Sequence, residues 1–174
     1  MQALYAGDPA RGRALLPPDD KLDVFEAAAF GRLHRLAAAL AADPAGASAR
    51  SRDGFTALHL AIFGCQPEAA QLLIEKGADV EALSEGSIAR VRSLGTSAFV
   101  RSAALAEMLL DAGADPNGRS DGGFTALHTA AANGDAPLIR LLLARGADPS
   151  AAGDDGRTPA DLAADEVRGM LRAE

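Results

Sequence analysis

The chain has 174 residues, 48% of them apolar and 24% charged, which is the composition of one ordinary globular domain and excludes an intrinsically disordered segment. A net charge of −7 makes a phosphate backbone, and therefore nucleic acid, a poor partner. The single cysteine excludes an intrachain disulfide, and no stretch approaches the roughly 20 apolar residues of a membrane span, so we expect a soluble, cytoplasmic chain. The apolar residues are mostly Ala and Leu, which favour helices.

An internal repeat organises the chain. The peptide GFTALH occurs at residues 54–59 and again at 123–128, 69 positions apart. The segment GRTPADLA at 156–163 has a similar outline, 33 residues after the second copy. Tetrapeptides ending in GAD close at Asp79, Asp115 and Asp148, with spacings of 36 and 33 residues. Since 33 and 36 add up to 69, a complete unit lies between the two identical peptides, and units of this length stack to bury their apolar faces.

Each unit is predicted to contain two short helices and a polar loop. A Thr side chain can satisfy a free backbone N–H at a helix start, and Pro159 suits the first helical position. Gly134 is expected to end the first helix of its unit, because glycine tolerates positive φ. The second helices are expected to end at left-handed glycines. The structural positions that follow are the caps Thr56, Thr125 and Thr158, and the closing glycines Gly77, Gly113 and Gly146.

The pattern resembles the ankyrin repeat. Its carriers are TALHLA with QLLIEKGAD, TALHTA with LLLARGAD, and the closing TPADLA, and the resemblance covers residues 20–174. It implies an all-α ankyrin-repeat solenoid of stacked helix-turn-helix units joined by β-hairpin-like loops, with about six helix pairs including degenerate caps. We expect one domain over residues 1–174, made of a capping helix pair (1–18), four repeats (20–52, 53–85, a divergent 86–120, and 121–153) and a C-terminal cap (154–174).

The third unit departs from the pattern. Counting back from its closing glycine places Leu94 in register with Leu58 and Leu127. Arg92 then replaces the cap Thr, a glycine replaces the His, and Arg101 stands where a glycine makes the inter-helix turn of the next unit. The three additional residues must lie in the loop before Leu94, so we expect the helices to continue with a longer loop and different capping.

The histidines and the cysteine raise the question of chemistry. The resemblance to ankyrin repeats implies a structural role for His59 and His128. In such repeats, the side chains at these positions form hydrogen bonds that tie the turn to the neighbouring loop. Cys65 stands at the turn position, where we expect the preceding Gly64 to make the turn. No metal-binding or phosphate-binding motif is present, so we expect no enzyme, no catalytic residue, no metal and no cofactor. The alternative is a small enzyme or ligand-binding protein with a groove site near His59 and Cys65.

The order of charges points to the divergent unit. Residues 53–85 carry six acids and one base, residues 86–102 carry three arginines and no acid, and residues 103–174 carry twelve acids and six bases. Arginine suits bidentate pairing with a carboxylate or phosphate. One interpretation is a basic spot that faces an acidic group of a partner. The other is internal pairing with flanking acidic loops, for example at Asp53, Glu81 and Asp121.

The resemblance implies a non-enzymatic protein-binding module, an adaptor, scaffold or inhibitor. We expect it to act as a monomer and, from its net charge and its lack of a long apolar run, to contact neither nucleic acid nor membrane. Ankyrin stacks bind partners through the concave face of loop tips and first helices. Phe63 and Phe99 share one register and are expected to line one stripe, whereas Phe55 and Phe124 have loop-against-loop packing as an alternative. The expected partner-binding residues are Arg52, Asp53, Phe55, Phe63, Arg90, Arg92, Phe99, Arg101, Asp121, Phe124, Asn133 and Arg157.

Overall fold

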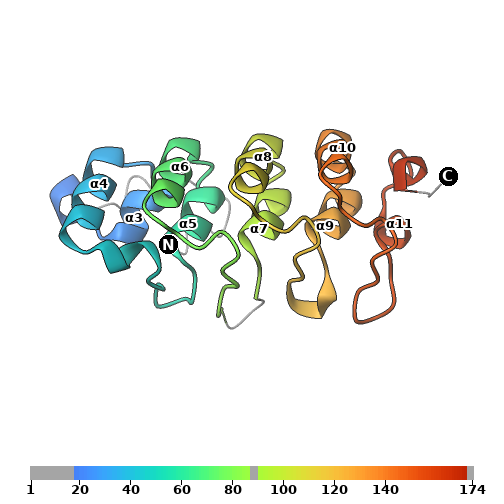
Figure 1. The fold of residues 1–174 in the computed structure, drawn as a ribbon, viewed down its shortest axis with the longest axis horizontal. Coiled ribbons are helices and arrows are strands. Elements are labelled where there is room, and N and C mark those ends of the chain that lie inside the picture. The colour runs from blue at the N-terminus through green and yellow to red at the C-terminus, as the bar shows by residue number, and fades with distance from the viewer. Residues whose placement is uncertain (1–17, 87–89, 172–174) are drawn as a thin grey trace. The chain divides into compact units, whose positions relative to one another are not determined.

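The computed structural model describes residues 18–86 and 90–171. Over these residues the chain is helical and contains no strand (Figure 1). Isolated antiparallel bridges join Arg50 to Thr56 and Leu83 to Arg92. The expected all-α ankyrin fold is therefore confirmed. The chain divides into two compact units. The described residues of unit 1 are 18–79 and 84–86, and those of unit 2 are 80–83 and 90–171.

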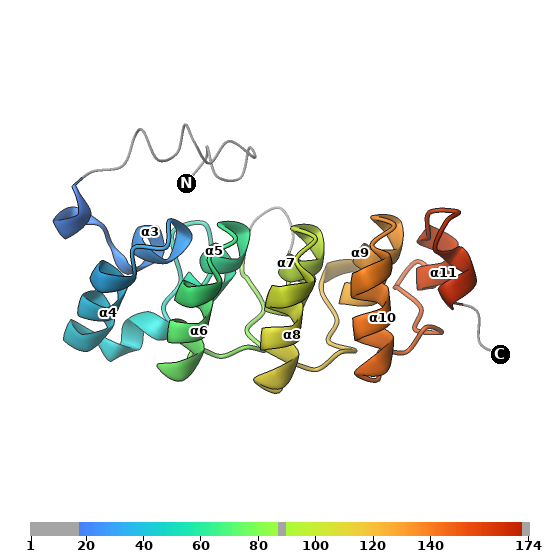
Figure 2. The same cartoon turned by 90° about the horizontal axis from the view of Figure 1, so that it is seen from above.

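Unit 1 contains two helix pairs. Its helices are η1 (Asp19–Lys21), α3 (Val24–Ala29), α4 (Leu33–Ala42), η2 (Pro44–Ala47), α5 (Ala57–Phe63) and α6 (Pro67–Glu75). The first helices α3 and α5 pack side by side, and so do the second helices α4 and α6 (Figure 2). Buried small residues at Ala28 and Ala61 allow close packing, and Leu58 and Leu73 fill the space between the helices.

Unit 2 repeats this arrangement. Its helices are α7 (Ser93–Phe99), α8 (Ala103–Asp111), η3 (Asp121–Gly123), α9 (Ala126–Ala132), α10 (Ala136–Ala144), α11 (Pro159–Leu162) and η4 (Arg168–Leu171). Helix α9 packs between α7 and α11, and α8 packs against α10 (Figure 2). Leu94 and Leu127 both occupy the second position of their helices, so the predicted register of the divergent unit is confirmed and its additional residues lie in the preceding loop.

The two ends of the described chain are less regular. After α11, which has four residues, Ala163 has extended backbone at φ −63° and ψ 135°, and the short η4 takes the place of a second helix. Near the other end, the 3-10 helix η2 follows α4, and the sequence pattern did not predict it. The helix pair expected before residue 18 lies outside the described residues.

The turn between the two helices of a pair has one conformation in four successive repeats. The second residue after the first helix of each pair, which directly follows the C-cap residue, has a left-handed φ in every case. The values are 65° at Gly31, 51° at Cys65, 56° at Arg101 and 65° at Gly134. The prediction that Gly64 makes the turn is wrong, because Gly64 has an ordinary φ of −76°. Cys65 makes the turn itself, and Gly64 is small because a Cβ there would collide with the carbonyl oxygen of Ala29 on α3.

Candidate protein-interaction surface

The Thr-His pair of unit 1 is a buried cap. Thr56 is the N-cap of α5, and its Oγ1 accepts a 3.3 Å hydrogen bond from the His59 N–H and lies 2.8 Å from His59 Nδ1. His59 is fully buried, whereas Cys65 is exposed beyond the other end of α5. A helix rises about 1.5 Å per residue, so these side chains start from backbone positions roughly 9 Å apart. The described part of the chain also holds no group of three or more His, Cys, Asp or Glu suited to a metal ion.

The Thr-His pair of unit 2 links a helix start to the next loop. The Thr125 N–H donates to His128 Nδ1 at 3.1 Å, and His128 Nε2 lies 3.1 Å from the carbonyl oxygen of Arg157. Since a carbonyl only accepts, Nε2 carries the proton and Nδ1 is the acceptor. Burial lowers the pKa of His128, because the charged form would lose its hydration. The ring is thus a neutral connector with both nitrogens engaged.

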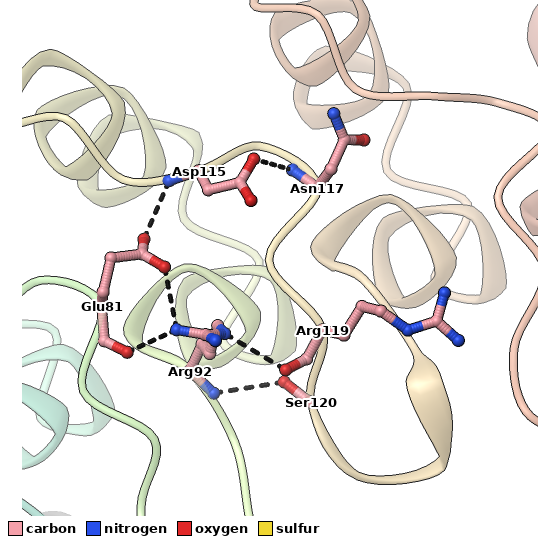
Figure 3. A network of polar contacts seen from close by, with 6 residues as sticks. All are labelled: Glu81, Arg92, Asp115, Asn117, Arg119 and Ser120. Atoms are coloured by element: carbon pink, nitrogen blue, oxygen red, sulfur yellow. Dashed lines mark hydrogen bonds and ion pairs between the residues drawn. The ribbon is translucent and has the colours of Figure 1, made fainter.

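Arg92 replaces the missing Thr-His pair with a different set of contacts (Figure 3). Its Nη1 donates to the carbonyl oxygen and to Oε2 of Glu81, at 2.5 and 2.8 Å. Its Nε donates to the carbonyl of Arg119 at 3.1 Å, and its backbone N–H donates to Ser120 Oγ at 3.1 Å. Glu81 in turn accepts from the Asp115 N–H at 2.8 Å. Arg92 therefore joins the loop that precedes α7 to the loop that follows α8.

Arg90 forms a second contact between these loops. Its backbone N–H and its Nε donate to the two carboxylate oxygens of Asp121, at 2.7 and 2.9 Å, and the Asp121 N–H donates back to the Arg90 carbonyl at 2.9 Å. The backbone hydrogen bond from Arg90 is the main reason that the pKa of Asp121 is lowered. Arg92 pairs with Glu81 and Arg90 with Asp121, as expected if the arginines of the divergent unit pair with flanking acidic loops. The Arg90 side chain nevertheless stays 58% exposed.

Successive loops are joined in the same way elsewhere in each unit. In unit 2, Arg119 pairs with Asp154 at 3.2 Å, and the Asp154 N–H donates to the Gly122 carbonyl at 2.8 Å. In unit 1, Arg50 pairs with Glu85 at 3.2 Å. The Glu85 N–H donates a hydrogen bond to the carbonyl oxygen of Gly54 at 2.8 Å. An arginine–carboxylate pair and a backbone hydrogen bond thus connect each loop to the next.

The phenylalanines of unit 1 gather around the first helices. The rings of Phe55 and Phe63 meet edge to face with centroids 5.4 Å apart. With Phe25 they pack, partly buried, against Phe30 and its neighbours Ala29 and Leu60. Phe55 therefore packs against the first helices α3 and α5, whereas Arg52 and Asp53, a few residues before it in the loop, are exposed.

Phe124 of unit 2 packs loop against loop, as its alternative interpretation proposed. Its ring centroid lies 5.2 Å from that of His128, and the Arg157 guanidinium carbon lies 5.8 Å from the ring centroid. A Cβ on Gly153, in the following loop, would come within 2.7 Å of the Phe124 ring. Arg157 also pairs with Asp155 at 2.6 Å, so this loop tip holds its own charges together.

The end of α7 exposes an aromatic residue and an arginine in the adjoining turn. Phe99, the last residue of α7, is 68% exposed, and Arg101 in the adjoining turn is exposed as well. Asn133 Nδ2 donates to the Ala98 carbonyl at 3.1 Å and so ties this end to the following repeat. Phe63 has the same position in α5 but is partly buried in its cluster. The two lie in different units, and a single stripe formed by them stays a prediction.

Sequence reasoning missed several capping and linking residues. Asp23 and Glu26 form a capping box at the start of α3, which the D-x-x-E spacing could have revealed. Asn117 connects two loops, since its Nδ2 donates to the Gly146 carbonyl at 3.0 Å and its Oδ1 accepts from the Asp148 N–H at 2.7 Å. No local signal predicts the Asn117 contacts, because the partners are about 30 residues away.

Comparison with known families agrees with this geometry. The family model described as "Ankyrin repeat" matches residues 53–85, and that described as "Ankyrin repeats (many copies)" matches residues 109–163. The chain belongs to the ankyrin repeat family, whose repeats generally mediate protein–protein interaction. No helix in residues 18–86 or 90–171 combines the length and the apolar character needed to cross a membrane.

Two curated proteins are similar over part of the chain. One is "Probable E3 ubiquitin-protein ligase XBOS31" of Oryza sativa subsp. japonica, 44% identical over 66 residues, which cover 37% of this chain and 15% of the rice protein. Another is "B-cell lymphoma 3 protein homolog" of Mus musculus, 35% identical over 88 residues, which cover 49% of this chain and 18% of the mouse protein. The matched segments thus span less than a fifth of either relative.

Proposed function

We propose that this chain is a non-enzymatic adaptor, scaffold or inhibitor that binds a partner protein as a monomer. The observation that carries the proposal is the exposure of Phe99, which is 68% exposed at the end of a first helix. Large apolar side chains are otherwise well covered, since Leu33, at 40%, is the other large apolar residue exposed in the described chain. An exposed aromatic ring on a rigid scaffold is typical of an anchor residue at a protein interface.

The proposed surface consists of loop tips and first-helix ends in each of the two units. Loop-to-loop bonds hold the tips in place, so a partner meets a preformed surface and binding requires little ordering of the chain. In unit 1 the surface residues are Arg52, Asp53, Phe55 and Phe63. In unit 2 they are Arg90, Arg92, Phe99, Arg101, Asp121, Phe124, Asn133 and Arg157, of which Arg92 and Phe124 also support the loops from within.

The similarity to a named ubiquitin ligase concerns a small part of that protein. We infer that the shared segment supplies the repeat scaffold and partner recognition rather than ligase chemistry. Support comes from unit 1, where the reactive groups considered in the sequence, His59 and Cys65, lie at opposite ends of α5, one buried and one exposed. Nucleophilic catalysis needs the nucleophile and its base within hydrogen-bonding reach.

Site-specific photo-crosslinking tests the proposal. The photoreactive residue p-benzoyl-phenylalanine would replace Asp53 or Ala132, which are exposed at a loop tip and at a first-helix end, or, as matched controls, Glu75 or Arg140, which are exposed on second helices. In native extract we expect the same partner protein to crosslink from Asp53 or Ala132 and not from the controls. Equal crosslinking from all four positions, or none from the first two, would contradict the proposed surface.

A further inference from the structure

Arg101 differs from most arginines of unit 2 in having no acidic partner. The arginines of this unit that pair with carboxylates are Arg90, Arg92, Arg119, Arg145, Arg157 and Arg168. Within the described residues the side chain of Arg101 makes neither an ion pair nor a hydrogen bond, and the same holds for Arg140 on α10. The nearest acid along the chain is Glu107, and it pairs with Arg145 at 3.4 Å.

The backbone of Arg101 is strained in a way that a glycine would relieve. Its φ is 56°, and the equivalent residue of the next repeat is Gly134 with a φ of 65°. A left-handed conformation costs a non-glycine residue roughly 1–2 kcal/mol. The turn itself is made by backbone bonds, from the Arg101 N–H to Ala98 O at 3.2 Å and from the Ser102 N–H to Ser97 O at 3.0 Å. The arginine side chain is therefore not needed to form this turn.

Phe99 lies two residues before Arg101 and is held on the same rigid segment. The hydrogen bond from Asn133 to the Ala98 carbonyl, at 3.1 Å, fixes the end of α7 against the next repeat. An exposed aromatic ring and a guanidinium that pairs with no acid among the described residues thus lie two positions apart on a backbone fixed at Ala98. Aromatic and arginine side chains dominate the binding energy of many protein interfaces, and a fixed backbone lowers the entropy lost on binding.

We propose that Phe99 and Arg101 form a recognition site for a protein segment that carries a carboxylate close to a large apolar side chain. The apolar side chain packs on the Phe99 ring, and the carboxylate accepts two hydrogen bonds from the Arg101 guanidinium. Recognition of a phosphate group is disfavoured, since phosphopeptide sites use clusters of arginines and the neighbouring Arg90 and Arg92 already bind Asp121 and Glu81. This inference rests on the proposed function and names the chemistry of the partner.

A random-peptide display library selected on the wild-type chain tests the site with a defined probe. Enriched peptides should carry Asp or Glu within a few residues of a large apolar residue. Synthetic copies should bind Phe99→Ala and Arg101→Glu about tenfold or more weakly than wild type, measured by fluorescence polarisation. Changing the peptide acid to Lys should restore binding to Arg101→Glu. The control Arg140→Glu has the same charge change on α10 and should bind within about twofold of wild type.

Arg101→Gly separates binding from folding. It should melt at a higher temperature than wild type and still bind the peptides about tenfold more weakly. The matched control Cys65→Gly relieves the same strain in unit 1 and should leave binding unchanged. The site is overturned if no peptide is enriched, if enriched peptides lack an acid, or if they bind Phe99→Ala and Arg101→Gly as tightly as wild type. A partner that crosslinks from Asp53 or Ala132 in any of these cases would leave the proposed function standing and remove only this inference.

Discussion

The guanidinium of Arg92 and the carboxylate of Glu81 lie 2.8 Å apart in the loop that precedes α7, and both groups also bond to the loop that follows α8. In the following repeat, the cap Thr125 and its partner His128 perform this linking. The divergent repeat therefore lost the Thr and His of the ankyrin pattern without losing a connection between loops. In the divergent repeat the connection is made by the charged side chain of Arg92, which has several donors. In the following repeat it is made by the neutral ring of His128, which bonds through its two nitrogens.

Removal of Arg92 should destabilise unit 2 more than removal of Arg90. Arg92→Ala deletes three side-chain hydrogen bonds from a charged donor that is 29% exposed, and we expect the free energy of unfolding to fall by about 2 kcal/mol. Arg90→Ala deletes a pair on a side chain 58% exposed and should cost less than about 1 kcal/mol. Urea unfolding followed by circular dichroism measures both, and equal losses would contradict the assigned role of Arg92.

Two adjacent residues in unit 1 should respond in opposite directions. Gly64→Ala places a Cβ against the Ala29 carbonyl and should lower the free energy of unfolding by about 2 kcal/mol, because α3 and α5 must move apart. Cys65→Gly relieves a left-handed φ of 51° and should raise it by about 1 kcal/mol. Thermal melts of the two variants suffice for the comparison. A destabilised Cys65→Gly would show that the thiol has a packing role that outweighs the strain.

Ser93→Ala should stabilise the divergent repeat. Ser93 Oγ is buried and has no hydrogen-bond partner in the part of the chain that the structure describes. The same position holds Ala57 in α5 and Ala126 in α9. An unsatisfied buried hydroxyl costs about 1–3 kcal/mol, so we expect a gain of about 1 kcal/mol in a urea titration. Ser97→Ala is the control, since Ser97 Oγ donates to the Leu94 carbonyl at 2.7 Å and its loss should not stabilise.

The buried His128 should make folding sensitive to mild acid. Its pKa in the folded chain is lowered below the ordinary 6.5, mainly by burial. Arg119 opposes the charged ring, while Asp155 and the Arg157 carbonyl favour it. As the pH falls through about 6.5, the unfolded chain binds the proton first, so the free energy of unfolding must decrease.

Unfolding free energies measured from about pH 8 to about pH 5.5 test this expectation. The decrease should be smaller in His128→Gln, which has no group to titrate at this position. The other histidines of the chain are present in both proteins, so the comparison isolates His128. An identical pH dependence in the two proteins would show that His128 is not the responsible group.

The helix register was predictable because it depends on local counting. A left-handed glycine follows the second helices α6, α8 and α10, at φ 84°, 93° and 88° in Gly77, Gly113 and Gly146, so counting back from it locates the first helix even in the divergent repeat. The T-x-L-H pattern likewise predicts its cap, because both partners lie within one turn of helix. Loop length does not disturb either signal.

The contacts of Arg92 and the turn at Cys65 were not predictable in this way. Arg92 bonds residues 11 and 27 positions away, on loops whose approach depends on how the helix pairs pack. At residues 64 and 65 the usual preference of glycine for positive φ gave the wrong answer, because Gly64 is required for the approach of α3 and α5. Close packing between helices outweighed the local preference of the turn.

The bonds between successive loops limit how the binding surface can change by mutation. Reversal of the charge of Asp154, for example, would place two positive groups side by side, because Arg119 lies 3.2 Å away on the preceding loop. A new charge pattern at the loop tips therefore needs matched substitutions in neighbouring repeats. Ala132, at the end of the first helix α9, is exposed and lies outside these pairs, so a single substitution there can alter specificity without a matched change elsewhere.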